Sequence, residues 1–79
     1  MARVLLFGRL ADVAGWRDRV IESASVAALR QLLCAEDAQL GAALAGPGVQ
    51  VAIDQAIVRG DAALGARAEV AFLPPMSGG

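Results

Sequence analysis

The sequence predicts an α+β domain, in which a mixed sheet of about five strands carries one main helix on one face. Short runs of strand-forming residues stand at both ends of the chain, and a single long segment of helical periodicity lies between them. The order strand, strand, helix, strand, strand, strand suits a helix packed across a sheet. The chain has 79 residues, which is the size of one small domain with a thin core.

The first third of the chain predicts two strands that pair with each other. Residues 3–7, RVLLF, form a short apolar run typical of a strand. Residues 8–16 are bracketed by Gly8 and Gly15, and they predict a loop with a short helical turn. Residues 17–22, RDRVIE, alternate well enough to predict a second strand that pairs back on the first.

The middle of the chain predicts the main helix, in the segment SASVAALRQLLCAED. Ser25 is the expected N-cap, because its hydroxyl can accept a hydrogen bond from a free amide of the first turn. The apolar residues on the predicted buried side of this helix are Val26, Leu29, Leu32 and Leu33. Leu40 and Leu44 predict a shorter helical piece, which stops at the GPG of residues 46–48.

The last third predicts a hairpin, a loop and a final strand. Residues 49–58, VQVAIDQAIV, read as two strands around a tight turn at Asp54 and Gln55. Residues 59–68 form a connecting loop, and residues 69–73, EVAFL, form the last strand.

The first and last strands are apolar on both faces, although one helix covers only one face of a sheet. Because side chains alternate along a strand, each face can be assigned. The side chains expected beneath the helix are Val4, Leu6, Val70 and Phe72. The side chains expected on the open face are Leu5, Phe7, Leu73 and Ile57. An exposed patch of this kind marks a partner surface; the alternative is that the loop after residue 7 folds over it.

The composition limits the chemistry that this chain can perform alone. It has no histidine, tyrosine or lysine, so Ser/His and Cys/His pairs and histidine metal sites are excluded. Its single cysteine, Cys34, excludes an internal disulfide and is expected to be a buried or half-buried structural residue. The net charge of −1 offers no basic patch for nucleic acid.

Three arginines and the single tryptophan are considered for their exposure and for a role at a partner surface. Arg9, Arg59 and Arg67 are expected in solvent, and Trp16 either anchors its loop or joins a partner surface. No leader-like segment opens the chain, and no apolar stretch approaches the about 20 residues of a membrane span. A cytoplasmic protein without membrane partners is therefore expected.

The sequence ends in a distinctive tail directly after the last strand. The tail consists of Pro74, Pro75, Met76, Ser77, Gly78 and Gly79. Proline cannot donate ladder hydrogen bonds and favours an extended exit, so sheet pairing is expected to end there. Six residues reach up to about 20 Å, and the side-chain-free glycines fit a narrow tunnel in another protein. We therefore expect a domain of residues 1–73 and a flexible tail that presents the carboxylate of Gly79.

Three segments of the sequence resemble those of a known family. AEVAFLPPMSGG closely resembles the C-terminal signature of the small, sulfur-carrier subunit of molybdopterin synthase, the MoaD-type member of the ubiquitin-like sulfur carriers. VAIDQAIV resembles the penultimate hairpin of that family, and RVLLFGRLADVAG resembles its opening strand and loop. The resemblance covers essentially the whole chain, and it implies a ubiquitin-like β-grasp fold.

The resemblance also implies a reaction cycle. A ubiquitin-activating-like adenylyltransferase uses ATP to adenylate Gly79, and a cysteine desulfurase or rhodanese-like donor supplies the sulfur that makes a thiocarboxylate. The tail then enters the large synthase subunit, where sulfur passes to cyclic pyranopterin monophosphate, and two transfers make the dithiolene of molybdopterin. The implied complex is a heterotetramer of two small and two large subunits. The chain itself would bind no cofactor or metal and would act as a sulfur-donating co-substrate rather than as a catalyst.

The resemblance assigns roles residue by residue. Gly79 is the thiocarboxylate carrier and Gly78 its slender neighbour. The residues assigned to the partner interface are Phe7, Ile57, Leu73, Pro74, Pro75, Met76 and Ser77. Two alternatives stay open: a sulfur carrier for thiamine thiazole, an amino acid or tRNA, and a ubiquitin-like modifier or passive interaction module.

Overall fold

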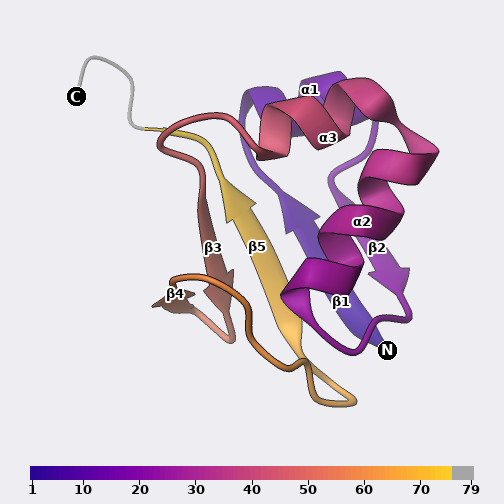
Figure 1. Cartoon of the computed structure of the whole chain (residues 1–79), viewed down its shortest axis with the longest axis vertical. Coiled ribbons are helices and arrows are strands. Elements are labelled where there is room, and N and C mark those ends of the chain that lie inside the picture. The colour runs from indigo at the N-terminus through magenta and orange to yellow at the C-terminus, as the bar shows by residue number, and fades with distance from the viewer. Residues whose placement is uncertain (76–79) are drawn as a thin grey trace.

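One mixed sheet of five strands forms the base of the molecule (Figure 1). The computed structural model describes residues 1–75. The strands are β1 (Ala2–Leu6), β2 (Asp18–Ile21), β3 (Gln50–Ile53), β4 (Ala56–Val58) and β5 (Glu69–Leu73). They lie in the order β2-β1-β5-β3-β4, and β1 pairs parallel with β5 while the other pairs are antiparallel. The predicted strands and the mixed sheet are therefore confirmed.

Three helices pack on one face of this sheet. They are α1 (Arg9–Ala14), α2 (Val26–Glu36) and α3 (Ala38–Leu44). The Ser25 hydroxyl accepts a hydrogen bond from the Ala28 amide at 3.1 Å, so Ser25 caps α2 as predicted. The Asp37 carboxylate caps α3 in the same manner, accepting from the Gln39 and Leu40 amides.

The core lies between the sheet and the helices. Val4, Val70 and Phe72 are 0% exposed and Leu6 is 3% exposed, as the alternation of the strands predicts. The helices bury their leucines in the same cluster; these are Leu10, Leu29, Leu33, Leu40 and Leu44. All three helices therefore cover the face that carries Val4, and no helix or strand of residues 1–75 covers the opposite face of the sheet.

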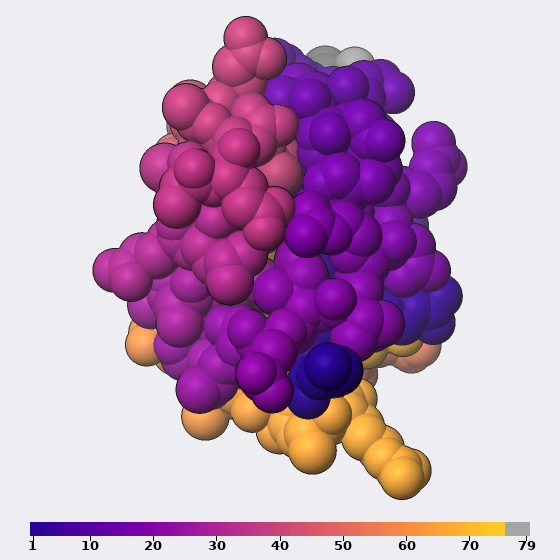
Figure 2. All heavy atoms as spheres, turned by 90° about the vertical axis from the view of Figure 1, so that its right-hand side faces the viewer, coloured from indigo at the N-terminus to yellow at the C-terminus, as the bar shows by residue number. Residues whose placement is uncertain are grey.

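The segment after residue 7 goes to the helical layer and not to the open face. It forms α1, a full helix where only a short turn is predicted, and it buries Leu10 and Ala11 in the core. Figure 2 shows the α1–β2 segment (indigo to purple) lying beside the α2–α3 segment (magenta to pink), and α1 contacts α3. The alternative in which this loop covers Phe7 is therefore wrong.

The hairpin of β3 and β4 turns at the predicted residues. Asp54 and Gln55 both have positive φ, 50° and 72°, which a two-residue turn of this hand requires. The Asp54 carboxylate accepts a hydrogen bond from the Glu69 amide at 3.0 Å, and the Asp54 amide donates to the Glu69 carbonyl at 2.8 Å. The turn is thereby tied to the start of β5.

Cys34 is a correction to the sequence analysis, because it is exposed and not buried. Leu33 lies on the buried side of α2, and each further residue rotates by about 100° around a helix, which turns Cys34 out of the core. Its side chain lies against the backbone of α3, where a Cβ at Gly41 would stand 2.7 Å from the Cys34 sulfur.

Candidate functional site: the open sheet face and the root of the tail

Strand register brings small and apolar side chains into rows on the open face. Leu5 pairs with Ala71, Ala71 with Ala52, and Ala52 with Ile57, so one row crosses four strands. Side chains of paired residues point to the same face of a sheet. Ala52 is only 6% exposed, because its neighbours in the row enclose its small side chain. The row is therefore continuous across the sheet.

Phe7 and Leu73 extend the open face toward the carboxyl end of β5. Each directly follows a residue of the buried pair Leu6 and Phe72, so its side chain points to the opposite face. The Phe7 amide donates to the Phe72 carbonyl at 3.3 Å, which keeps the two strands paired at this point. Phe7 is 45% exposed and Ile57 is 48% exposed, and Leu73 is half-buried. We call the whole surface the open-face patch; its residues are Leu5, Phe7, Ala52, Ile57, Ala71 and Leu73.

Charged groups border the patch at the opposite end of β1. Arg3 bonds Asp18 through two guanidinium nitrogens, the shorter contact being 2.7 Å, and lies 3.7 Å from Glu69. The hydrogen bond from Arg3 holds the pKa of Asp18 below its ordinary value, and the same bond raises the pKa of Arg3. The open face is thus ionic at the start of β1 and along its β2 edge, where Asp18 pairs with Leu5, and apolar toward the end of β5.

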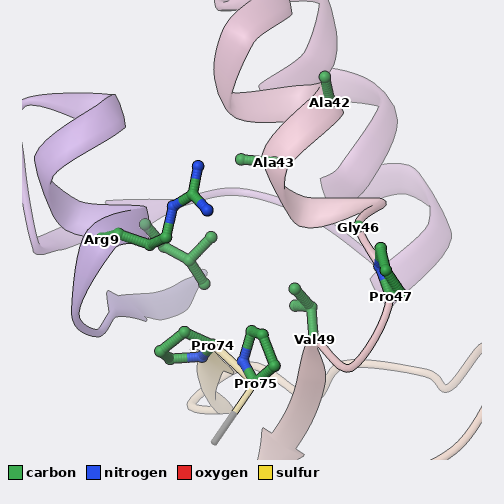
Figure 3. Close-up of a pocket in the computed structure, with 9 residues that line it drawn as sticks. Arg9, Ala42, Ala43, Gly46, Pro47, Val49, Pro74 and Pro75 are labelled. Carbon is green, nitrogen blue, oxygen red and sulfur yellow. The ribbon is translucent and has the colours of Figure 1, made fainter. Parts of the chain in front are cut away.

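The apolar end of the face is where the tail leaves the sheet. β5 ends at Leu73, and Pro74 and Pro75 follow without strand pairing, as their missing amides predict. On the helical side of this point lies a cavity of about 350 Å³ (Figure 3). Its walls come from the two prolines, from Val49, from Ala42 and Ala43 of α3, and from Arg9 of α1.

The structure reaches only some of the predicted site residues. Phe7, Ile57, Leu73, Pro74 and Pro75 share one end and one face of the sheet, whereas Met76, Ser77, Gly78 and Gly79 lie outside the described residues. Sequence reasoning missed two glycines at the root of the tail, Gly8 and Gly48, whose backbones contact the prolines. The GPG of residues 46–48 is the sequence signal for Gly48, because it marks a turn as well as the end of a helix.

No group of three or more histidine, cysteine, aspartate or glutamate side chains within residues 1–75 is placed to hold a metal ion. No helix of this part of the chain has the length and apolar character needed to cross a membrane.

Comparison with solved structures shows the fold family. The chain is similar to the crystal structure of SAMP1 from Haloferax volcanii, with a TM-score of 0.85 and 26% sequence identity. The similarity covers 99% of this chain and 98% of that chain, and it confirms the ubiquitin-like β-grasp fold. A search of curated proteins by sequence finds no match.

Comparison with family models is more specific. Residues 4–79 match the ThiS family, so the match runs over nearly the whole sequence and includes the residues of the tail. Ubiquitin-like sulfur carriers work with partner enzymes that activate them and transfer sulfur. On this evidence the chain belongs to the ThiS family of ubiquitin-like sulfur carriers.

Proposed function

We propose that this ThiS-family chain is the sulfur-carrier subunit of a molybdopterin synthase, with the carboxyl group of Gly79 as its reactive group. The observation that carries the proposal is the continuity of the open-face patch with the root of the tail: the patch ends at Leu73, and the tail begins at Pro74. A partner that binds the patch is therefore adjacent to the tail. The resemblance of AEVAFLPPMSGG to the molybdopterin branch supports this branch over the others.

Activation of the carboxyl group follows ordinary acyl chemistry. A carboxylate oxygen of Gly79 attacks the α-phosphorus of ATP in the activating enzyme, and pyrophosphate leaves. The terminal sulfur of a donor persulfide then attacks the acyl-adenylate carbon, and AMP leaves. A thiol reduces the resulting acyl disulfide, which gives the thiocarboxylate and a disulfide between the thiol and the donor.

Transfer of the sulfur takes place in the large subunit. The thiocarboxylate sulfur attacks a carbon of cyclic pyranopterin monophosphate that carries an oxygen substituent, and the carbon–oxygen bond breaks as this oxygen leaves as hydroxide or as the oxygen of the cyclic phosphate. Water then cleaves the resulting thioester, which leaves the sulfur on the substrate and restores the Gly79 carboxylate. Two such transfers supply the two sulfur atoms of the dithiolene. This chain has no histidine, tyrosine or lysine to act as an acid–base group, so the large subunit supplies the catalytic side chains.

The interface energetics agree with this division of roles. Phe7 and Ile57 together offer two large, half-exposed side chains to a partner. Full burial of an exposed side chain of this size contributes about 1.5–3 kcal/mol, and because each of these is already about half-buried, a partner that covers it gains about 1 kcal/mol per side chain. We expect the assembled synthase to contain two copies of this chain and two large subunits.

Genetic rescue tests the pathway. The host strain lacks its own molybdopterin synthase small subunit. The chain is expressed in this strain together with the large subunit and the activating enzyme that are its natural partners. Molybdoenzyme activity should return with the intact chain and not with a variant that lacks Gly79. A parallel strain deficient in the thiamine thiazole sulfur carrier, given the same partners, should not be rescued. Rescue of thiamine synthesis alone, or isopeptide-linked adducts without any rescue, would contradict the molybdopterin role and favour the alternatives.

A further inference from the structure

Both prolines at the root of the tail lie against glycine backbone. A Cβ built at Gly48 would stand 2.7 Å from the Cβ of Pro75 and 3.6 Å from its Cα. A Cβ built at Gly8 would stand 3.0 Å from the Cγ of Pro74. Contacts of 2.7 Å between carbon atoms are far inside the normal separation of about 3.5–4.0 Å, so any side chain at Gly48 displaces Pro75.

The two glycines belong to loops from different parts of the chain. Gly8 lies between β1 and α1, and Gly48 lies between α3 and β3. Both adjacent elements are anchored in the core, through Leu10 on one side and Leu44 on the other. Because the pyrrolidine ring fixes φ of proline, a contact on the ring of Pro75 constrains the direction of the backbone that follows it.

We propose that Gly48 is a positioning residue: by seating Pro75 against its bare backbone, it sets the direction in which the backbone leaves the domain at Pro75. This proposal rests on the proposed function for its consequence, since the direction matters only if the terminal carboxyl must reach a reactive site in a partner. A misplacement of a reacting group by about 1 Å costs up to about 100-fold in rate.

The chain contains matched controls for this contact. Gly48 has φ of +82°, a conformation that side chains rarely adopt, and this alone favours glycine there. Gly15 and Gly60 have almost the same φ, +81° and +76°, but a Cβ at either would meet nothing within 4 Å. Alanine at any of the three sites therefore adds similar backbone strain, and only Gly48→Ala adds the collision with Pro75.

The first experiment measures the direction of the tail in the free protein. A nitroxide label is attached to Cys34, which is exposed and is the one cysteine of the chain. Paramagnetic broadening of the Gly78 and Gly79 amides is then recorded by NMR. Gly48→Ala should change this broadening, whereas Gly15→Ala and Gly60→Ala should reproduce the wild-type profile. Identical profiles for Gly48→Ala and Gly60→Ala would overturn the proposal.

A double-mutant cycle tests whether the effect passes through Pro75. Replacing Pro75 by glycine removes the Cβ that the new side chain would strike. In a Pro75→Gly background, Gly48→Ala should therefore cause no further change in broadening. An undiminished change in that background would show that Gly48 acts by another route and would contradict the proposed seat.

The second experiment measures the consequence for activation. ATP–pyrophosphate exchange is followed with the cognate activating enzyme and each variant. Gly48→Ala should lower kcat by about 10- to 100-fold with KM nearly unchanged, because the open-face patch is intact. Gly15→Ala should stay within about twofold, because a Cβ at this site meets nothing within 4 Å. If Gly48→Ala alters the NMR broadening profile of the tail but not kcat, the positioning role is overturned. If the wild-type protein itself supports no ATP–pyrophosphate exchange, the result counts against the proposed function. In that case the NMR experiment alone decides whether Gly48 seats Pro75.

Discussion

Arg3 and Asp18 are joined by a contact of 2.7 Å between guanidinium and carboxylate, which links β1 to the edge strand β2 on the open face. Glu69 of β5 lies 3.7 Å from the same guanidinium, so Arg3 connects three neighbouring strands. Arg3 and Glu69 stand at the end of the face opposite the tail. Asp18 pairs with Leu5 and lines a pocket together with Phe7, so the network borders the open-face patch along the β2 side.

The Arg3–Asp18 pair predicts a specific pH dependence of stability. Hydrogen bonding to Arg3 lowers the pKa of Asp18 in the folded state below the unfolded value of about 3.9. The ionised carboxylate therefore stabilises the fold above about pH 4, and this contribution is lost as the pH falls through the folded-state pKa. The urea midpoint of Asp18→Asn should be below wild-type at pH 7, and the two midpoints should converge under acid conditions.

A matched variant controls for the general effect of removing one negative charge. Glu22→Gln changes an exposed carboxylate that makes no hydrogen bond or ion pair within residues 1–75. Its urea midpoint should follow wild-type at both pH values. A difference between Asp18→Asn and wild-type that is the same at pH 7 and in acid would contradict the role of the ionised pair.

Adjacent residues of β5 should respond very differently to truncation. Phe72 is 0% exposed beneath the helices, so Phe72→Ala should cost about 3–5 kcal/mol of the free energy of unfolding. Leu73 is half-buried on the open face, so Leu73→Ala should cost about 1 kcal/mol. Urea denaturation of the two variants measures this. Equal losses would mean that Leu73 belongs to the core and not to the open-face patch.

Ile57 should matter for binding and not for folding. Its side chain is 48% exposed in the patch, so Ile57→Ala should weaken binding to the large subunit or activating enzyme by about 10-fold while the melting temperature stays close to wild-type. Val20, 62% exposed, pairs with Arg3 at the ionic end of the same face and provides the control. Val20→Ala should leave the affinity within about twofold, as for a residue outside a hot spot. Calorimetry that shows equal losses for both would place the binding surface elsewhere.

Most of the fold could be predicted from the sequence because alternation and helical spacing are local signals. The alternation of Val4 and Phe72 with Phe7 and Leu73 correctly separated the buried face from the open one. The turn at Asp54 could also be predicted from the sequence, since aspartate tolerates positive φ. The interpretation of residues 8–16 as mostly loop fell short because a six-residue helix gives too few turns for a periodic pattern.

The parts that could not be predicted depend on distant contacts. Cys34 follows two leucines in sequence, and its exposure depends on how the packing of α2 on the sheet orients that helix, with Leu33 toward the core. The seat of Pro75 on Gly48 joins residues far apart in the chain: the GPG of residues 46–48 marks a turn, but only the fold brings Pro75 against it. The site was thus predicted as a set of residues, and its spatial order around the root of the tail came from the structure.

The central claim is that the carboxyl group of Gly79 carries sulfur, and intact-mass spectrometry tests it most directly. The chain is produced together with its activating enzyme and sulfur donor and is measured without digestion. The account predicts a species heavier than the plain chain by one exchange of oxygen for sulfur, and its disappearance when Gly79 is deleted or the activating enzyme is omitted. A mass that remains that of the plain carboxylate under these conditions would contradict the account.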